Sequence, residues 1–102
     1  MAEFKAGRVT VSQAGTRVAF PSVRKKCLWL RVTANEANSG DVFFGDIFVS
    51  STVGRTLKTG TDEVNNQTEI PFSQNGGGVD LNSIYLDAAN NNDYIEYEAI
   101  LE

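Results

Sequence analysis

The sequence predicts an all-β fold, a single β-sandwich or jelly-roll-like domain of about seven to eight short antiparallel strands. Hydrophobic and polar residues alternate with a period of two in several short segments. Clusters of Gly, Pro, Asn and Asp separate these segments at short intervals, and no stretch keeps a helical period over three turns. With 102 residues, the chain suits one domain with its own core, spanning residues 1–102.

The N-terminal part is expected to supply the first strands. Residues 1–7 show little pattern, so they form either a flexible N-terminal arm or a first edge strand. The alternation that follows places Val9 and Val11 on one face of a strand. A second alternating segment covers residues 16–20, and Pro21 closes it because proline cannot donate a hydrogen bond to a ladder.

Residues 27–34 form the clearest strand of the chain. A period of two predicts that one face carries Leu28, Leu30, Val32 and Ala34 and that the other carries Cys27, Trp29, Arg31 and Thr33. Trp29 and Arg31 are therefore expected to point away from the main core. Trp29 either covers a sandwich edge or packs under a loop, or it contacts a partner, since Trp and Arg are enriched at the centres of interfaces.

The stretch 41–57 lies at the centre of the predicted fold. Its aromatic and β-branched residues are crowded between glycines. This pattern predicts a strand over 42–44, a turn at 45–46 and a second strand over 47–50. Gly54 marks a further break in the chain.

The C-terminal half is expected to alternate between loops and strands. The predicted segments are a loop over 58–68, an edge strand over 69–72, a loop over 73–78, a strand over 79–88, a turn over 89–93 and a strand over 94–101. Pro71 confines its strand to a sheet edge. The inward-facing residues of the last two strands are expected to be Ile84, Leu86, Ala88, Ile95, Tyr97, Ala99 and Leu101.

Charge is distributed unevenly along the chain. Residues 1–34 hold seven Lys and Arg against one acid, whereas residues 35–102 hold two against 12 acids. A nucleic-acid-binding protein needs a basic stripe that carries aromatic residues, and the net charge of −4 argues against one, so no nucleic-acid partner is expected. The split charge favours docking onto another protein with a complementary potential. A solvated surface without a partner is the alternative.

The candidate partner-binding residues are Arg24, Lys25, Lys26, Trp29 and Arg31. The first three form a basic connection before the strand 27–34, and the last two lie on its outward face. No membrane partner is expected, because no apolar run approaches the about 18 residues of a membrane span and the N-terminus lacks a signal-peptide core.

The sequence offers little catalytic chemistry. It contains no histidine, which excludes Ser-His and Cys-His catalysis in their usual forms and metal sites of the Cys/His type. The single cysteine, Cys27, cannot form an intramolecular disulfide and is expected to be a small packing residue or an incidental surface thiol. Asp80, Asp87 and Asp93, with the asparagines at 90–92, could suggest calcium, which favours oxygen ligands. Their spacing matches no EF-hand loop, and turn chemistry explains the asparagines. We expect no enzyme, no cofactor and no metal.

Two motifs carry a family resemblance. The first is V-F-F-G-D-x-x-V-S-S-x-x-G-x-x-L from Val42 to Leu57, and the second is D-L-N-S-I-Y-L-D-A from Asp80 to Ala88. Together with the preceding C-L-W-L-R-V-T-A-N strand and the early V-T-V and G-T segments, they resemble a family of small β-sandwich proteins of tailed-bacteriophage virions. The resemblance covers residues 8–101, and its motifs are structural rather than catalytic. The segments 58–68 and 73–78 depart from the family pattern.

The resemblance implies a structural virion protein, a capsid decoration (cement) protein that binds the assembled phage head and stabilises it. The implied partners are the major capsid protein of the same phage and further copies of the chain on the capsid surface, after synthesis in the host cytoplasm. The alternative is a tail or head-fibre module with a receptor- or carbohydrate-binding role. A host carbohydrate-binding β-sandwich is a third reading, disfavoured because Trp29 alone offers a clearly outward ring.

Overall fold

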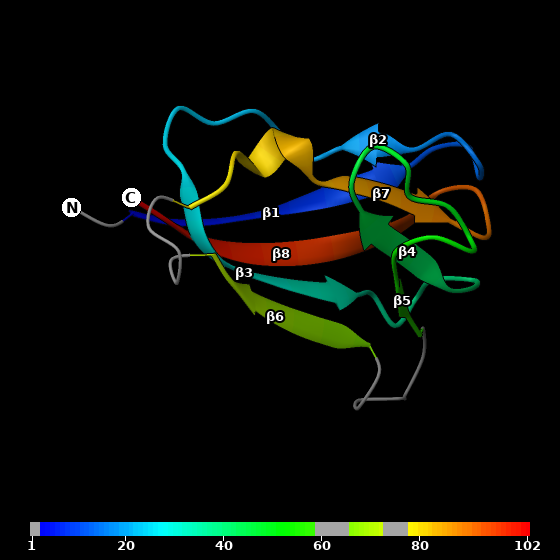
Figure 1. The fold of residues 1–102 in the computed structure, drawn as a ribbon. Coiled ribbons are helices and arrows are strands. Elements are labelled where there is room, and N and C mark those ends of the chain that lie inside the picture. Colours follow the sequence, from blue (N-terminus) through cyan, green and yellow to red (C-terminus); the bar gives the residue numbers. More distant parts are fainter. Residues whose placement is uncertain (1–2, 59–65, 73–77) are drawn as a thin grey trace.

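The predicted all-β class is confirmed in the computed structural model, which describes residues 3–58, 66–72 and 78–102. Its described strands form two antiparallel four-stranded sheets packed face to face (Figure 1). The strands are β1 (Glu3–Val11), β2 (Val18–Ala19), β3 (Cys27–Ala34), β4 (Val42–Gly45), β5 (Arg55–Leu57), β6 (Gln67–Pro71), β7 (Tyr85–Ala88) and β8 (Asp93–Leu101). One 3₁₀ turn, η2 (Leu81–Ser83), precedes β7.

The strand order is that of a jelly roll. The first sheet has the order β1-β8-β3-β6 and the second sheet the order β2-β7-β4-β5. The antiparallel pairs β1·β8, β2·β7, β3·β6 and β4·β5 describe one long hairpin of eight strands that is folded over on itself. The pair β3·β8 completes the first sheet, and the pair β4·β7 completes the second. The two-sheet, eight-stranded jelly roll is a common way for antiparallel proteins to limit exposed edges.

The core lies between the two sheets and follows the predicted alternation most closely in β8. All four residues expected to face inward there are buried, and the strand pairs on both sides, with β1 and with β3. The largest fully buried side chains of the core are Phe20, Leu30, Leu57, Leu81, Leu86 and Ile95. Burial of these apolar faces is the main stabilising term for such a sandwich, at about 25 cal/mol per Å² removed from water.

The N-terminal segment is an edge strand from Glu3 onward. β1 pairs with β8 along its whole length, from Glu3 opposite Leu101 to Val11 opposite Asp93. Of the two alternatives for residues 1–7, the edge strand therefore holds for residues 3–7. Gly7 leaves room for the Tyr97 ring to lie against β1, because a Cβ there would lie 2.7 Å from the Tyr97 hydroxyl oxygen.

The predicted strand over 47–50 is wrong. The Asp46 carboxylate accepts a hydrogen bond from the Phe48 N–H (2.9 Å), and the Asp46 carbonyl accepts one from the Val49 N–H (3.0 Å). A short polar side chain that bonds to the backbone two residues later stabilises a turn instead of a strand. The aromatic and β-branched composition was outweighed by this local turn.

The predicted strand over 79–88 is only half right. Residues 85–88 form β7, whereas residues 81–83 form η2 and Val79 makes an isolated bridge to Cys27. The carbonyl of Asp80 accepts hydrogen bonds from both the N–H and the hydroxyl of Ser83, which closes the turn before β7. Asn92 adopts a positive φ of 68° in the following turn, as expected of asparagine there.

The bounds of β3 match the predicted 27–34, but the assignment of Cys27 to the outward face is wrong. The register of β3 against β8 shifts between Cys27 and Trp29, so the alternation breaks at that point. A β-bulge of this kind turns the residues on its two sides relative to one another. Cys27 is consequently fully buried and Leu28 only half-buried, whereas Trp29 and Arg31 point outward as predicted. Burial raises the pKa of the Cys27 thiol.

Several other bounds differ by a few residues. The edge strand predicted over 69–72 is β6, at residues 67–71, and Phe72 still donates its N–H to the Leu28 carbonyl. The strand predicted over 16–20 is reduced to two residues in β2, although Phe20 is buried as expected. The loops predicted over 58–68 and 73–78 lie mostly outside the described residues.

Candidate partner-binding surface

The outer face of the first sheet carries an apolar row that crosses all four strands. The registers place Phe4 of β1 opposite Ile100 of β8, Ile100 opposite Trp29 of β3, and Trp29 opposite Pro71 of β6. Phe4, Ile100, Trp29 and Pro71 are called the apolar row below. Phe4 is 64% exposed, and the other three are half-buried or exposed. Four apolar residues from four strands thus lie side by side on a solvent-facing sheet.

An ionic row lies next to the apolar row on the same face. The Arg31 guanidinium donates a hydrogen bond to Glu98 (2.8 Å) and lies 3.7 Å from Glu69, and it sits over the Trp29 ring at 5.8 Å. The hydrogen bond and the charge of Glu98 raise the pKa of Arg31. Arg31 points outward as predicted, but its charge is already paired within the chain. Its contact with Trp29 helps to fix the orientation of the indole.

The far end of the face is polar. Arg8 stacks over the Tyr94 ring at 4.3 Å, and the Asn35 amide donates to Glu96 (2.7 Å). Exposed ion pairs and stacked cations contribute little to stability, at most about 1 kcal/mol each. The face therefore divides into an apolar end near the start of β1 and a polar end near its finish.

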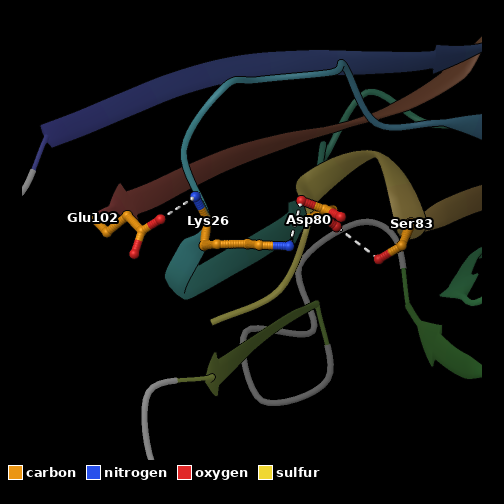
Figure 2. A network of polar contacts seen from close by, with 4 residues as sticks. All are labelled: Lys26, Asp80, Ser83 and Glu102. Carbon is orange, nitrogen blue, oxygen red and sulfur yellow. Dashed lines mark hydrogen bonds and ion pairs between the residues drawn. The ribbon is translucent and has the colours of Figure 1, made fainter. Parts of the chain in front are cut away.

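The basic connection before β3 lies at the apolar end of the sandwich. Arg24 and Lys25 are exposed, and the Lys25 ammonium lies 3.7 Å from Glu3, whose side chain lies on the opposite face of β1 from Phe4. Lys26 differs from both. Its ammonium donates to Asp80 at 3.0 Å, and its backbone N–H donates to the Glu102 carboxylate, as Figure 2 shows. The Lys26 carbonyl also accepts a hydrogen bond from the Glu102 N–H.

The structure therefore places four of the five predicted residues at one end of the molecule. Trp29 sits in the apolar row and Lys26 is held against Asp80, whereas Arg24 and Lys25 lie at the same end of the first sheet but on its inner side, near Glu3 and Leu101. Among the described residues, Arg24 has no ion-pair partner. Arg31 shares the face but is neutralised by two glutamates.

Phe4 and Ile100 belong to this surface and were missed from the sequence. Phe4 fell in a segment expected to be an arm or an edge strand, and Ile100 lay on the outward face of the last strand. The alternation of Phe4 with Ala6 and Arg8 was an available signal for a common face. Only the register of β1, β8 and β3 shows that Ile100 lies next to Trp29 and that Phe4 lies on the far side of Ile100.

Of the three aspartates considered for calcium, Asp87 and Asp93 serve the turns, and Asp80 pairs with Lys26. Asp93 accepts hydrogen bonds from the N–H groups of Ser39 and Gly40, and Asp87 accepts them from Gly15 and Ala88. Both carboxylates are buried and hydrogen-bonded to backbone. Within residues 3–58, 66–72 and 78–102, no cluster of three or more Asp, Glu, Cys or His could hold a metal ion.

No helix in the described part of the chain is both long and apolar enough to cross a membrane. Comparisons of the sequence and structure with family models, curated proteins and solved structures found no match.

Proposed function

We propose that this chain is a structural protein of a tailed-phage virion that decorates the assembled head and stabilises it. The apolar row is the observation that carries the proposal. Exposed, contiguous apolar residues on a folded monomer mark sites of interaction with other proteins. The motifs from Val42 to Leu57 and from Asp80 to Ala88 supply the virion context, and jelly rolls recur in viral capsid domains, which is an analogy at the level of the fold.

The apolar row would act as the centre of the interface. Trp29 is flanked by Ile100 and Pro71, and Arg31 holds one side of its ring, so little side-chain freedom is lost on docking. Arg24 and Lys25, called the basic rim below, lie at the same end of the first sheet as the row but on its inner side. A partner with an apolar patch and acidic groups beside it fits this arrangement.

Stabilisation of the head would follow from mass action. A protein that binds the assembled shell and not the free subunits shifts the equilibrium toward the shell. Because many copies bind one particle, their individual stabilising contributions add up over the lattice of capsid subunits, even if each copy binds with modest affinity. No bond is made or broken in this mechanism.

Binding to undecorated heads tests the proposal. The purified chain is added to heads of the encoding phage assembled without it, and bound copies are counted by cosedimentation and located by electron microscopy. We expect copies distributed over the whole shell and a higher temperature of head disruption. A few copies confined to the tail or to one vertex would favour the tail or head-fibre alternative, and no binding to any virion part would reject both.

Trp29→Ala is expected to weaken head binding by about 30-fold or more, since truncating a central interface aromatic commonly costs at least about 2 kcal/mol. Tyr85→Ala is the matched control, because Tyr85 is a half-buried aromatic at the start of β7 in the second sheet. It should leave binding unchanged. If Trp29→Ala binds heads as tightly as Tyr85→Ala, and thermal unfolding shows that both variants are folded, the apolar row is not part of the interface.

Neutralising the basic rim should slow docking. The double variant Arg24→Gln and Lys25→Gln removes two exposed cations and keeps the Lys26 contact to Asp80. We expect a slower association rate at low ionic strength and a difference that shrinks as salt rises, because rim charges act mainly on association and are screened over about 8 Å at physiological salt. Lys58→Gln, a cation near the opposite end of the molecule, is the control. Equal rates at low salt would exclude the rim.

A further inference from the structure

The connection between β4 and β5 presents a second apolar surface, separate from the apolar row. Ile47 is 49% exposed, Phe48 70% and Val53 49%. Residues 47–54 carry no charge, whereas Asp46 and Arg55 flank them with opposite charges. We call residues 47–53 the knob. Interface centres are typically apolar and depleted of charge, with charged groups around them.

The backbone of the knob is held firmly although its side chains are exposed. The side chain and carbonyl of Asp46 accept hydrogen bonds from Phe48 and Val49, and Ser50 and Val53 exchange two backbone hydrogen bonds at 2.9 and 3.3 Å. The Val49 side chain is fully buried and anchors the turn to the core. The fold thus fixes the base of an exposed phenyl group before any partner arrives, which lowers the entropy that binding would cost.

An apolar hollow lies beside the knob. It has a volume of about 260 Å³, and Phe44, Ile70, Phe72 and Ile84 form its walls, with Asp46 and Ser83 on its rim. This is below the roughly 300–1,000 Å³ of sites for small molecules. A closed apolar cavity of about 150 Å³ already holds a benzene ring. The hollow is open to solvent, unlike such a cavity, and its volume is sufficient to seat one aromatic side chain.

The knob and the hollow meet at Asp46. Asp46 contributes to the rim of the hollow and makes the hydrogen bond that positions Phe48, yet Phe48 does not line the hollow of its own chain. Two adjacent complementary features suit a two-fold axis, because each copy can then offer its projection to the recess of the other. Such an arrangement closes at the dimer.

We propose that the chain forms a two-fold dimer in which Phe48 of each copy enters the hollow of the other. Charge complementarity supports a second copy as the occupant. Arg55 pairs in register with Phe44, a wall of the hollow, and it is exposed, without an ion pair among the described residues. A two-fold pairing of the loops brings this cation toward the acidic Asp46 of the partner.

This dimer does not depend on the capsid proposal, and it leaves the apolar row uncovered. The row faces outward from the first sheet, whereas the hollow is walled by inward-facing residues of both sheets. A dimer would therefore expose two copies of the apolar row, one from each chain.

Sedimentation velocity of the purified chain over a concentration series tests the dimer. We expect a monomer–dimer equilibrium in the wild type. For Phe48→Ser, we expect the dissociation constant of the dimer to rise by about 30-fold or more. Phe4→Ser is the matched control, since Phe4 is exposed to a similar extent on another surface, and it should dimerise like the wild type. Ser83→Trp, which places a bulky ring on the rim of the hollow, should also block dimerisation, with thermal unfolding as the check on its fold.

The outcomes separate the alternatives. Mixing Phe48→Ser with Ser83→Trp should restore partial dimerisation, because one intact knob then meets one intact hollow. A wild type that is monomeric throughout, or a dimer indifferent to Phe48→Ser, would overturn the proposal. Open-ended polymers would reject the two-fold geometry. A monomer whose hollow binds benzyl alcohol, followed by NMR shifts, would assign the hollow to an aromatic side chain of a different protein.

Discussion

Phe20→Ala is expected to lower the free energy of unfolding by about 4 kcal/mol, since buried Phe→Ala substitutions cost roughly 3–5 kcal/mol. Phe20 is 1% exposed, and its ring lies 5.4 Å from that of Tyr97. Its N–H donates to the Ile84 carbonyl, which ties the end of β2 to the segment before β7. Removing the ring leaves a cavity between the sheets that the surrounding strands cannot close. Thermal unfolding should show a fall in Tm of roughly 15–30 °C for a domain of this size.

Phe4→Ala is the control for this prediction. The same side chain is deleted, but Phe4 is 64% exposed on the outer face of the first sheet. Stability should change by no more than about 0.5 kcal/mol, as for most surface substitutions, while binding to heads should weaken. A large loss of stability in Phe4→Ala would mean that Phe4 belongs to the fold and not to an exposed docking surface.

Gly54→Ala is the second substitution with a large expected effect, about 3 kcal/mol of destabilisation. Gly54 has a φ of +113°, which L-residues rarely adopt, and such backbone strain costs about 1–3 kcal/mol. A Cβ there would also lie 2.7 Å from the Phe44 carbonyl oxygen and 2.8 Å from a Val49 methyl. The carbonyl belongs to β4 and cannot move without disturbing the sheet, so overpacking adds to the strain. Chemical denaturation measures the loss.

Gly15→Ala separates the two causes. Gly15 also has a positive φ, +87°, but a Cβ there would meet nothing within 4 Å. Only the strain applies, so we expect a smaller loss, about 1–2 kcal/mol. Equal losses at both glycines would show that the crowding around Gly54 relaxes. If the knob dimerises as proposed, Gly54→Ala should in addition weaken dimerisation more than Gly15→Ala does.

The partner-binding surface depends on both local and long-range structure. The sequence predicted that Trp29 and Arg31 point outward, because a period of two fixes the side-chain directions within a strand. It could not predict that Arg31 is already paired with Glu98 and Glu69, which come from other strands. Register between strands depends on contacts across the sheet and is not encoded in one segment.

By itself, the sequence determined the all-β class, the bounds of β3, and the inward and outward faces of β8. These follow from alternation and turn residues within each segment, which are local properties. The tertiary structure decided what local pattern cannot contain. It paired Glu3 with Leu101, aligned Phe4, Ile100, Trp29 and Pro71 into one row, and shifted the register at Cys27 so that the thiol faces the core. It also set the knob beside the hollow, because β4, β6 and η2 meet only when the long hairpin of eight strands folds over.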